Sequence, residues 1–355
     1  MINKSNQSIK PLIFDLDLPE LESFFAEWGE PAFRAKQLWH GLYQQLWNSP
    51  GQFTNLPKPL RERLTEHFRF SAFTPEHTLQ SSDQQTEKIL FRLPDNYAIE
   101  TVLMRYDTRR TLCISSQSGC AMGCVFCATG QMGFRRNLTS GEIIEQVLHY
   151  ARSLKAVDEQ VTNIVVMGMG EPFHNYAAVL KAIDQLNHPE GMNLGERRFT
   201  ISTVGLIPGI RKFTSEKRQV NLAISLHAAN NELRTSLVPS NARYPLEDLI
   251  EACKDYVNTT RRRITFEWAL IQDVNDTPAH ARELALLIKG MLCHVNIISL
   301  NPTKKYSGRS TTQERAVAFK NVLEKAGIPC TIRLRRGIDI QAGCGQLASE
   351  AGMDK

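Results

Sequence analysis

One stretch of fifteen residues holds four of the chain's eight cysteines, and it reads Cys113-Ile-Ser-Ser-Gln-Ser-Gly-Cys120-Ala-Met-Gly-Cys124-Val-Phe-Cys127. Its last three cysteines have the spacing C-x-x-x-C-x-x-C. Thiolates are soft ligands that suit zinc and iron–sulfur clusters. A closed zinc site needs a fourth ligand, and no cysteine or histidine stands nearby to supply it. The spacing therefore indicates a [4Fe–4S] cluster with one iron open to another molecule. Three buried, inert cysteines, or a zinc site completed from elsewhere, are the alternatives.

The composition is that of an ordinary globular protein, with 42% hydrophobic residues over 355 positions. No run of about 18 apolar residues occurs, so we expect no transmembrane helix. Residues 1–11 are polar, so we also expect no signal peptide. Clustered cysteines without an export signal favour a cytoplasmic protein. The net charge of +5 is compatible with an anionic partner but is weak evidence for one.

Helical spacing dominates the first part of the chain. Apolar residues recur every three or four positions up to Gly29, again after Pro31 with Phe33 and Leu38 on one side, and again over 57–70. These patterns predict a small N-terminal helical accessory domain over residues 1–75. Residues 88–93 and 97–104 flank a turn at 94–96, which predicts a β-hairpin within an extension over 76–106.

From residue 107 onward, strand and helix patterns alternate. We expect strands near 111–116, 161–167, 197–203, 219–226, 263–271 and 294–300, with a last extended piece at 329–335. A capping box at Thr139–Glu142 opens one helix, and further helices are expected near 174–187, 205–213, 245–257, 277–290 and 312–326. Six β–α units predict an α/β fold whose sheet curls into a partial (β/α)6 barrel over 107–340, followed by a loop and tail over 341–355.

The active site of such a fold lies where the strands end at their carboxyl side. Candidate residues stand at these predicted ends: Gly170, Glu171, Ser202, Ser225, Leu226, His227 and Asn301. For a single serine or histidine, helix capping or core hydrogen bonding is an equal alternative.

A second cysteine feature lies near the end of the chain. Cys344 stands between Gly343 and Gly345, and such a glycine-flanked loop favours an exposed, reactive thiol. The three other cysteines, Cys253, Cys293 and Cys330, sit inside apolar patterns and are predicted to be core residues.

Taken in order, these motifs resemble the radical S-adenosylmethionine enzymes, and within them the RlmN family. The likeness runs from about residue 20 to 348 and includes the cysteine stretch and these further motifs: Gly133-Phe-Arg-Arg-Asn-Leu-Thr139, Met167-Gly-Met-Gly-Glu-Pro172, Ser225-Leu-His-Ala228 and Cys344-Gly-Gln-Leu347. It implies methylation of carbon 2 of an adenosine in the peptidyl transferase centre of 23S rRNA, and of the adenosine 3′ of the anticodon in tRNAs.

Three alternatives stay open at this point. The sister family Cfr methylates carbon 8 of the same rRNA adenosine and shares nearly every motif. A non-catalytic iron–sulfur protein that binds RNA or carries electrons would not need Cys113 or Cys344. A radical enzyme acting on a small molecule is the third alternative.

The resemblance also implies roles for individual residues. Cys120, Cys124 and Cys127 would hold the cluster, and two S-adenosylmethionine molecules would be used per turnover. One would methylate Cys344, and the other would give the 5′-deoxyadenosyl radical that activates this methyl group for addition to adenine. Cys113 would then release the RNA by forming a transient disulfide with Cys344, with Glu100 as the proton acceptor.

The cofactor contacts follow from the same resemblance. Gly170 and Glu171 would meet the amino group of S-adenosylmethionine, Ser202 and Ser225 to His227 its ribose and carboxylate, and Asn301 its adenosine. We expect a monomer that meets 23S rRNA before full ribosome assembly and is reduced by a donor such as a flavodoxin system. Candidate phosphate contacts, with solvated surface charge as the equal alternative, are Arg135, Arg136, Arg261 to Arg263, Lys304, Lys305, Arg309, Arg333, Arg335 and Arg336.

Overall fold

The computed structural model describes residues 10–333 and 335–348, so the predicted tail beyond residue 348 lies outside the described residues. A ten-stranded sheet organises the fold, in the order β1-β2-β3-β4-β7-β8-β9-β10-β11-β12. Its strands are β1 (Thr74–Gln80), β2 (Thr86–Arg92), β3 (Ala98–Arg105), β4 (Arg110–Cys113), β7 (Asn163–Val166), β8 (Phe199–Thr203), β9 (Asn221–Ser225), β10 (Ile264–Leu270), β11 (Cys293–Ser299) and β12 (Cys330–Ile332).

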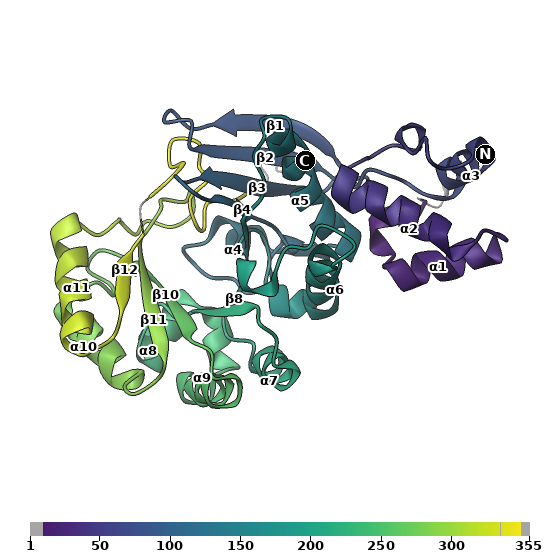
Figure 1. Ribbon diagram of the computed structural model, residues 1–355. Coiled ribbons are helices and arrows are strands. Elements are labelled where there is room, and N and C mark those ends of the chain that lie inside the picture. Colours follow the sequence, from purple (N-terminus) through teal and green to yellow (C-terminus); the bar gives the residue numbers. More distant parts are fainter. Residues whose placement is uncertain (1–9, 334, 349–355) are drawn as a thin grey trace, which may run out of the picture.

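Strands β4 and β7 to β12 are parallel, and helices cover the outer side of this curved part of the sheet (Figure 1). The six predicted β–α units and the α/β fold are thus confirmed. The helices are α4 (Ala128–Met132), α5 (Ser140–Lys155), α6 (Tyr176–Asn187), α7 (Ile207–Glu216), α8 (Asn231–Leu237), α9 (Leu246–Thr260), α10 (Pro278–Leu287) and α11 (Gln313–Lys325). Helices α4 and α8 are short and were not predicted.

The predicted hairpin forms from β2 and β3, which pair antiparallel from Thr86 opposite Met104 to Arg92 opposite Ala98. Strand β3 also pairs with β4, the strand that leads into the cysteine stretch, while the predicted division of the chain at 76–106 stays a prediction. Strand β1 adds a further antiparallel strand on the outer edge. The hairpin therefore continues the barrel sheet and carries Glu100 toward the cysteine region.

Three helices form the N-terminal region, set to one side of the barrel in Figure 1: α1 (Leu18–Glu27), α2 (Ala32–His40) and α3 (Lys58–His67). A capping box between Asp17 and Glu20 begins α1. Phe33 was expected on the apolar side of α2, but 52% of it is exposed and the Arg34 guanidinium lies 4.8 Å from its ring centroid. The domain boundary near residue 75 stays a prediction.

Helix α5 fastens the cysteine stretch to the rest of the fold. It begins with the predicted capping box, in which Thr139 Oγ1 accepts the Glu142 N–H at 3.2 Å. One turn later, buried Gln146 accepts the Ser115 N–H at 2.8 Å and donates to the Ser115 carbonyl at 2.9 Å. These paired bonds fix the chain just after β4. None of the helices in the described part of the chain has both the length and the apolar composition to cross a membrane.

His149 of α5 makes stability depend on pH. Burial, with a smaller effect of nearby Arg152, lowers the pKa of His149 from 6.5 to about 4, and its ring meets that of Phe91 edge to face at 4.9 Å. Between these two pKa values the unfolded chain takes up the proton more readily, so stability present above pH 6.5 is lost as the pH falls toward 4. We expect the loss at pH 5 to be about 1–2 kcal/mol.

Urea unfolding of the protein and of the His149→Gln variant at pH 7.5 and 5.0 tests this expectation. The stability difference between the two proteins should change with pH, because only the parent loses the histidine contribution in acid. An identical pH dependence in both proteins would contradict it.

Candidate active site

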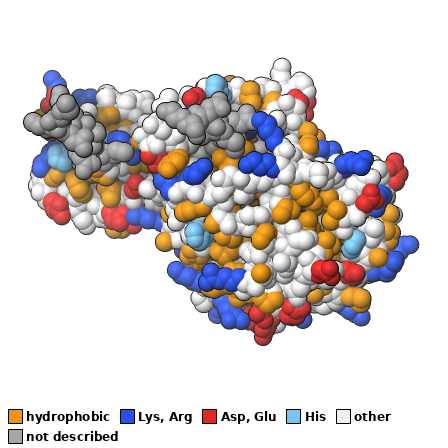
Figure 2. Space-filling view, turned by 180° about the vertical axis from the view of Figure 1, so that it is seen from behind, with side chains coloured by type: hydrophobic (Ala, Val, Ile, Leu, Met, Phe, Trp, Pro, Cys, Tyr) orange, Lys and Arg blue, Asp and Glu red, His pale blue; other side chains and the backbone are white. Residues whose placement is uncertain are grey.

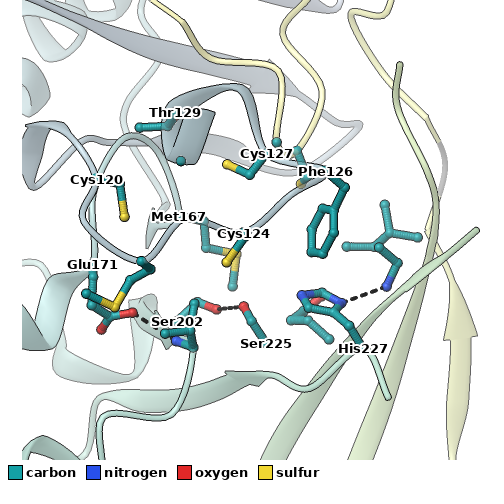
Figure 3. A pocket seen from close by; sticks show the side chains of 18 of the residues that line it. Cys120, Cys124, Phe126, Cys127, Thr129, Met167, Glu171, Ser202, Ser225 and His227 are labelled. Atoms are coloured by element: carbon teal, nitrogen blue, oxygen red, sulfur yellow. Dashed lines mark hydrogen bonds between the residues drawn. The ribbon is translucent and has the colours of Figure 1, made fainter. Parts of the chain in front are cut away.

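The carboxyl ends of the parallel strands open into one cavity. It is lined by the cysteine stretch and by residues that end β7, β8, β9 and β11 (Figure 3). Of the predicted site residues, those that line it are Cys120, Cys124, Cys127, Gly170, Glu171, Ser202, Ser225, His227, Asn301 and Cys344. Residues far apart in the chain therefore meet as the strand-end argument predicted.

The three cluster-type cysteines face this cavity from a loop that lies between two small strands, β5 (Gln117–Gly119) and β6 (Phe134–Asn137). Gly119 has φ +72°, and a Cβ there would lie 2.0 Å from the Gly133 carbonyl oxygen, so only glycine fits where the loop closes. Cys120 and Cys124 are buried, and Cys127 is partly buried just before α4.

Burial raises the pKa of Cys120 to about 12, and it is also the main cause of the raised pKa values of Cys124 and Cys127. The neighbouring thiols and Glu171 add to this effect for Cys120 and Cys124. Such a site disfavours bare thiolates but suits thiolates bound to iron, because a metal's positive charge reverses the penalty.

Within the described ranges, no three Cys, His, Asp or Glu side chains converge as ligands of one metal ion. Three thiols around a common cavity fit a multi-iron cluster better than a single zinc.

Glu171 places a carboxylate beside the cysteines. It is 2% exposed, and its two oxygens accept the Phe173 N–H at 3.0 Å and the Val204 N–H at 2.9 Å. Burial raises the pKa of Glu171 to about 7, although these backbone bonds lower it. Among the described residues Glu171 forms no ion pair, and such a buried carboxylate is suited to receive a cation, for example the ammonium group of an amino acid.

Ser202, Ser225 and His227 follow along the cavity wall. The hydroxyls of Ser202 and Ser225 lie 3.3 Å apart. Nδ1 of His227 accepts the Ala269 N–H at 3.0 Å, and burial lowers the pKa of His227 to about 3. The ring is therefore neutral with its proton on Nε2, and it meets the Phe126 ring edge to face at 4.9 Å. This wall offers hydroxyl and N–H groups that suit a ribose or a carboxylate.

Two predicted cofactor residues offer no side chain to the cavity: Gly170 lines it with its backbone, and Leu226 lies outside it. Gly170 has φ +104°, and a Cβ there would lie 2.6 Å from the Gln117 side chain, so glycine is required for this turn. Leu226 is fully buried in the hydrophobic core. Its N–H donates to the Glu267 carbonyl and its carbonyl accepts from Arg234, so its backbone is already occupied.

The second cysteine pair meets in an adjoining cavity. Cys113 and Cys344 line it together with Cys127 and Arg333, although 231 positions separate the pair. Cys344 is exposed, as predicted, whereas burial, with a smaller effect of Cys344, raises the pKa of Cys113 to about 12. Cys253, Cys293 and Cys330 are buried, as predicted. The Cys344 carbonyl accepts from Asn301 Nδ2 at 3.1 Å, so Asn301 holds the loop as well as lining the cofactor cavity.

Glu100 lies behind the segment that carries Cys344. It is 3% exposed, and its oxygens meet Lys88 Nζ at 3.0 Å and accept the Ala348 N–H at 2.8 Å. The carboxylate therefore ties the β2–β3 hairpin to the C-terminal loop. Its role as the proton acceptor stays a prediction.

Arg234 was not identified from the sequence. This residue of α8 is 1% exposed and donates to the Val204 carbonyl at 2.6 Å, the Leu226 carbonyl at 3.2 Å and Asn241 Oδ1 at 2.7 Å. It thereby fixes the chain after β8 and β9, beside the serines and His227. An arginine between Leu233 and Thr235 on a short helix gives no sequence sign of burial, so nothing in the pattern marked it.

Known proteins resemble this chain over nearly its whole length. Residues 114–285 match the family model of the radical SAM superfamily, and residues 12–70 match that of the ribosomal RNA large subunit methyltransferase N-terminal domain. The Dual-specificity RNA methyltransferase RlmN 1 of Myxococcus xanthus is 48% identical over 94% of this chain and 93% of its own. A probable dual-specificity RNA methyltransferase RlmN of Chloroflexus aurantiacus is 46% identical over 95% and 92%.

A solved structure has the same fold as this chain. The crystal structure of a radical SAM methyltransferase from Sphaerobacter thermophilus has a TM-score of 0.94 at 50% identity, covering 96% of this chain and 99% of that one. The fold, the cysteine site and the full-length relatives thus all indicate a radical SAM enzyme. The chain belongs to the RlmN family of the radical SAM superfamily.

Proposed function

We propose that this enzyme methylates carbon 2 of an adenosine in 23S rRNA and of the adenosine 3′ of the anticodon in tRNAs. The meeting of Cys113 and Cys344 in one cavity beside Cys127 carries the proposal, because an iron–sulfur electron carrier has no use for this second thiol pair. The relatives are named as dual-specificity RNA methyltransferases, so carbon-8 methylation of the Cfr type is not favoured.

The cofactors are a [4Fe–4S] cluster and S-adenosylmethionine, which together supply a 5′-deoxyadenosyl radical. Cys120, Cys124 and Cys127 would hold the cluster. Buried Glu171 would pair with the cofactor's ammonium group, and Gly170 would let the backbone approach it. Ser202, Ser225 and the Nε2–H of His227 would bind its ribose and carboxylate.

The remaining residues handle the methyl group. Cys344 would accept a methyl group from one S-adenosylmethionine, since its thiol is exposed on a loop held by Asn301. After the methylene carbon has bonded to the adenine ring, Glu100 would take the ring proton, and the adduct's one unpaired electron would return to the cluster. Cys113 would then bond to the Cys344 sulfur as the carbon–sulfur bond breaks, and the Cys113 thiol proton would complete the methyl group. This releases the methylated RNA and leaves a disulfide that two electrons must reduce.

The enzyme also needs an electron donor and a surface for RNA. Thiol exchange in the reducing cytoplasm would re-reduce the disulfide, and a flavodoxin system would serve as the electron donor of the enzyme, which we expect to be a monomer. The face shown in Figure 2 carries several separate groups of Lys and Arg side chains rather than one continuous patch. Such groups suit a folded RNA that touches the protein at several phosphates.

Replacing Cys113 with alanine should trap the RNA on the protein. Without this thiol the Cys344–adenine bond has no resolving partner, so a covalent protein–RNA complex should accumulate in up to one copy per enzyme while turnover falls by at least about 10³-fold. Denaturing gel electrophoresis of enzyme grown with its RNA, before and after ribonuclease, measures the complex. Cys293→Ala, which removes a thiol outside both cavities, should give none.

Anaerobic turnover on undermethylated ribosomal RNA and transfer RNA tests the function itself. Digestion followed by mass spectrometry should locate 2-methyladenosine in both RNAs. A product of 8-methyladenosine would overturn the regiochemistry, and an absence of any methylated adenosine with the loaded enzyme would overturn the function.

A further inference from the structure

A second, larger cavity lies at the opposite end of the barrel. Its volume is about 1070 Å³, and the residues that line it stand at the amino ends of β4 and β7 to β12, whereas the cysteine cavity lies at the carboxyl ends. We call it the amino-end cavity. Met167 and Glu267 line both cavities and form the floor between them.

The inward-facing side chains of this end are polar. Asn163, Thr200, Asn221 and Thr265 face the amino-end cavity, whereas their strand neighbours are buried apolar residues under the helices, for example Ile164 beside Asn163. Closed barrels usually fill this space with branched apolar side chains. Here the alternation places amides and hydroxyls around an open space instead.

Arginine dominates the rim. Seven arginines line the amino-end cavity against a single acid, Glu267. Five of them come from two short segments, Arg197–Arg198 and Arg261–Arg263. In the described part of the chain, only Arg333 among the seven lies within ion-pair distance of a carboxylate, at 3.8 Å from Glu267. The cavity therefore holds several positive charges that the protein itself does not neutralise.

Two buried nitrogen atoms at the amino-end cavity also indicate that this cavity takes a ligand. Nε of Arg262 and Nδ1 of His294 are both shielded from solvent, and neither has a hydrogen-bond partner among the described residues. Buried polar atoms in native proteins nearly always have partners. Like charges gathered around a cavity repel each other unless an anion lies between them.

We propose that the amino-end cavity binds phosphate groups, carried either by a free nucleoside triphosphate or by a segment of RNA backbone. Guanidinium groups bind phosphate oxygens in pairs, and the neutral amides and hydroxyls suit a ribose and a base. Small-molecule pockets span about 300–1,000 Å³, so the cavity accommodates a ligand of nucleotide size. The inference does not depend on the methyl-transfer chemistry, because none of the proposed catalytic residues lines this cavity.

The test compares two double variants of the full-length, cluster-loaded protein. Arg198→Gln with Arg263→Gln removes two cavity arginines that make no side-chain hydrogen bond to another described residue, so the fold should not suffer. Arg211→Gln with Arg282→Gln removes two exposed helix arginines elsewhere and matches the charge change. Calorimetric titration with ATP, inorganic triphosphate and a uridine oligonucleotide gives the affinities, and circular dichroism checks the fold.

We expect triphosphate and ATP to bind the parent protein and the control, and to bind the cavity variant at least about 10-fold more weakly. If the oligonucleotide displaces triphosphate and loses affinity in the same variant, the phosphate belongs to RNA; if it does not, the ligand is a free nucleotide. Equal affinities of both double variants for all three probes, or no binding to the parent protein, would overturn the inference, whatever the outcome of the methylation assay.

Discussion

Cys344→Ala is expected to abolish methyl transfer, with a loss of at least about 10³-fold, while the cluster and cofactor binding remain. The side chain is exposed, so its removal should change stability by no more than about 0.5 kcal/mol. The loop around it is held by backbone groups: the Cys344 carbonyl accepts from Asn301, and the Gly345 carbonyl accepts the Ala128 N–H at 2.7 Å. Alanine keeps both bonds, so a loss of activity reports on the sulfur.

Methylated product, iron and sulfide content, and bound S-adenosylmethionine should be measured on the same preparation. The Cys120→Ala variant is the complementary control, because it should lose iron and product together. Full methyl transfer by Cys344→Ala would rule out a methyl-cysteine intermediate and favour direct chemistry on the RNA.

Arg234→Met should cost about 3–5 kcal/mol of folding stability. Methionine fills a similar volume but donates no hydrogen bond, so the Val204 carbonyl and Asn241 Oδ1 lose this donor, and the Leu226 carbonyl is left with the Ala228 N–H at 2.9 Å. Burial already lowers the pKa of Arg234 to about 10, which shows how far the guanidinium lies from water. The ends of β8 and β9 should loosen, and S-adenosylmethionine should bind more weakly.

Urea unfolding and equilibrium dialysis measure the two effects. Arg282→Met, an exposed residue of α10, should stay within about 0.5 kcal/mol of the parent protein and bind the cofactor normally. A stability change of that small size in Arg234→Met would mean that water or rearrangement satisfies the oxygens that lose the arginine.

Much of the barrel follows from the sequence because its strands are short apolar runs with polar residues at their ends. Glu171, Ser202 and Ser225 could be placed at one rim by that rule alone, and the structure brings them together. The meeting of Cys113 with Cys344 could be suggested only by family resemblance, since no local pattern relates residues so distant in the chain.

The placement of charged residues was the part of the structure that the sequence predicted least well. Arg234 is buried without any sign of it in the sequence. The arginines at 261–263 and 333 were candidate phosphate contacts, but the sequence did not indicate that they gather in one cavity with Arg197 and Arg198. Burial of a charge depends on partners from other elements, such as the carbonyls of Val204 and Leu226, which no periodicity encodes. Phe33 shows the reverse error, because an apolar residue at helical spacing need not face the core.

The way the Cys344 segment is attached suggests how it can move. Residues 343–348 belong to no strand or helix, and side-chain and backbone bonds from Asn301, Ala128, Thr129 and Glu100 hold them in place. A segment secured by a few such bonds can open locally at a small free-energy cost while the sheet stays folded. Hydrogen exchange at the Ala128 and Ala348 amides would record this opening directly. In each catalytic cycle the Cys344 sulfur must meet the methyl donor, the RNA and the Cys113 thiol one after another. If the segment must open between these encounters, the rate of opening sets an upper limit on turnover.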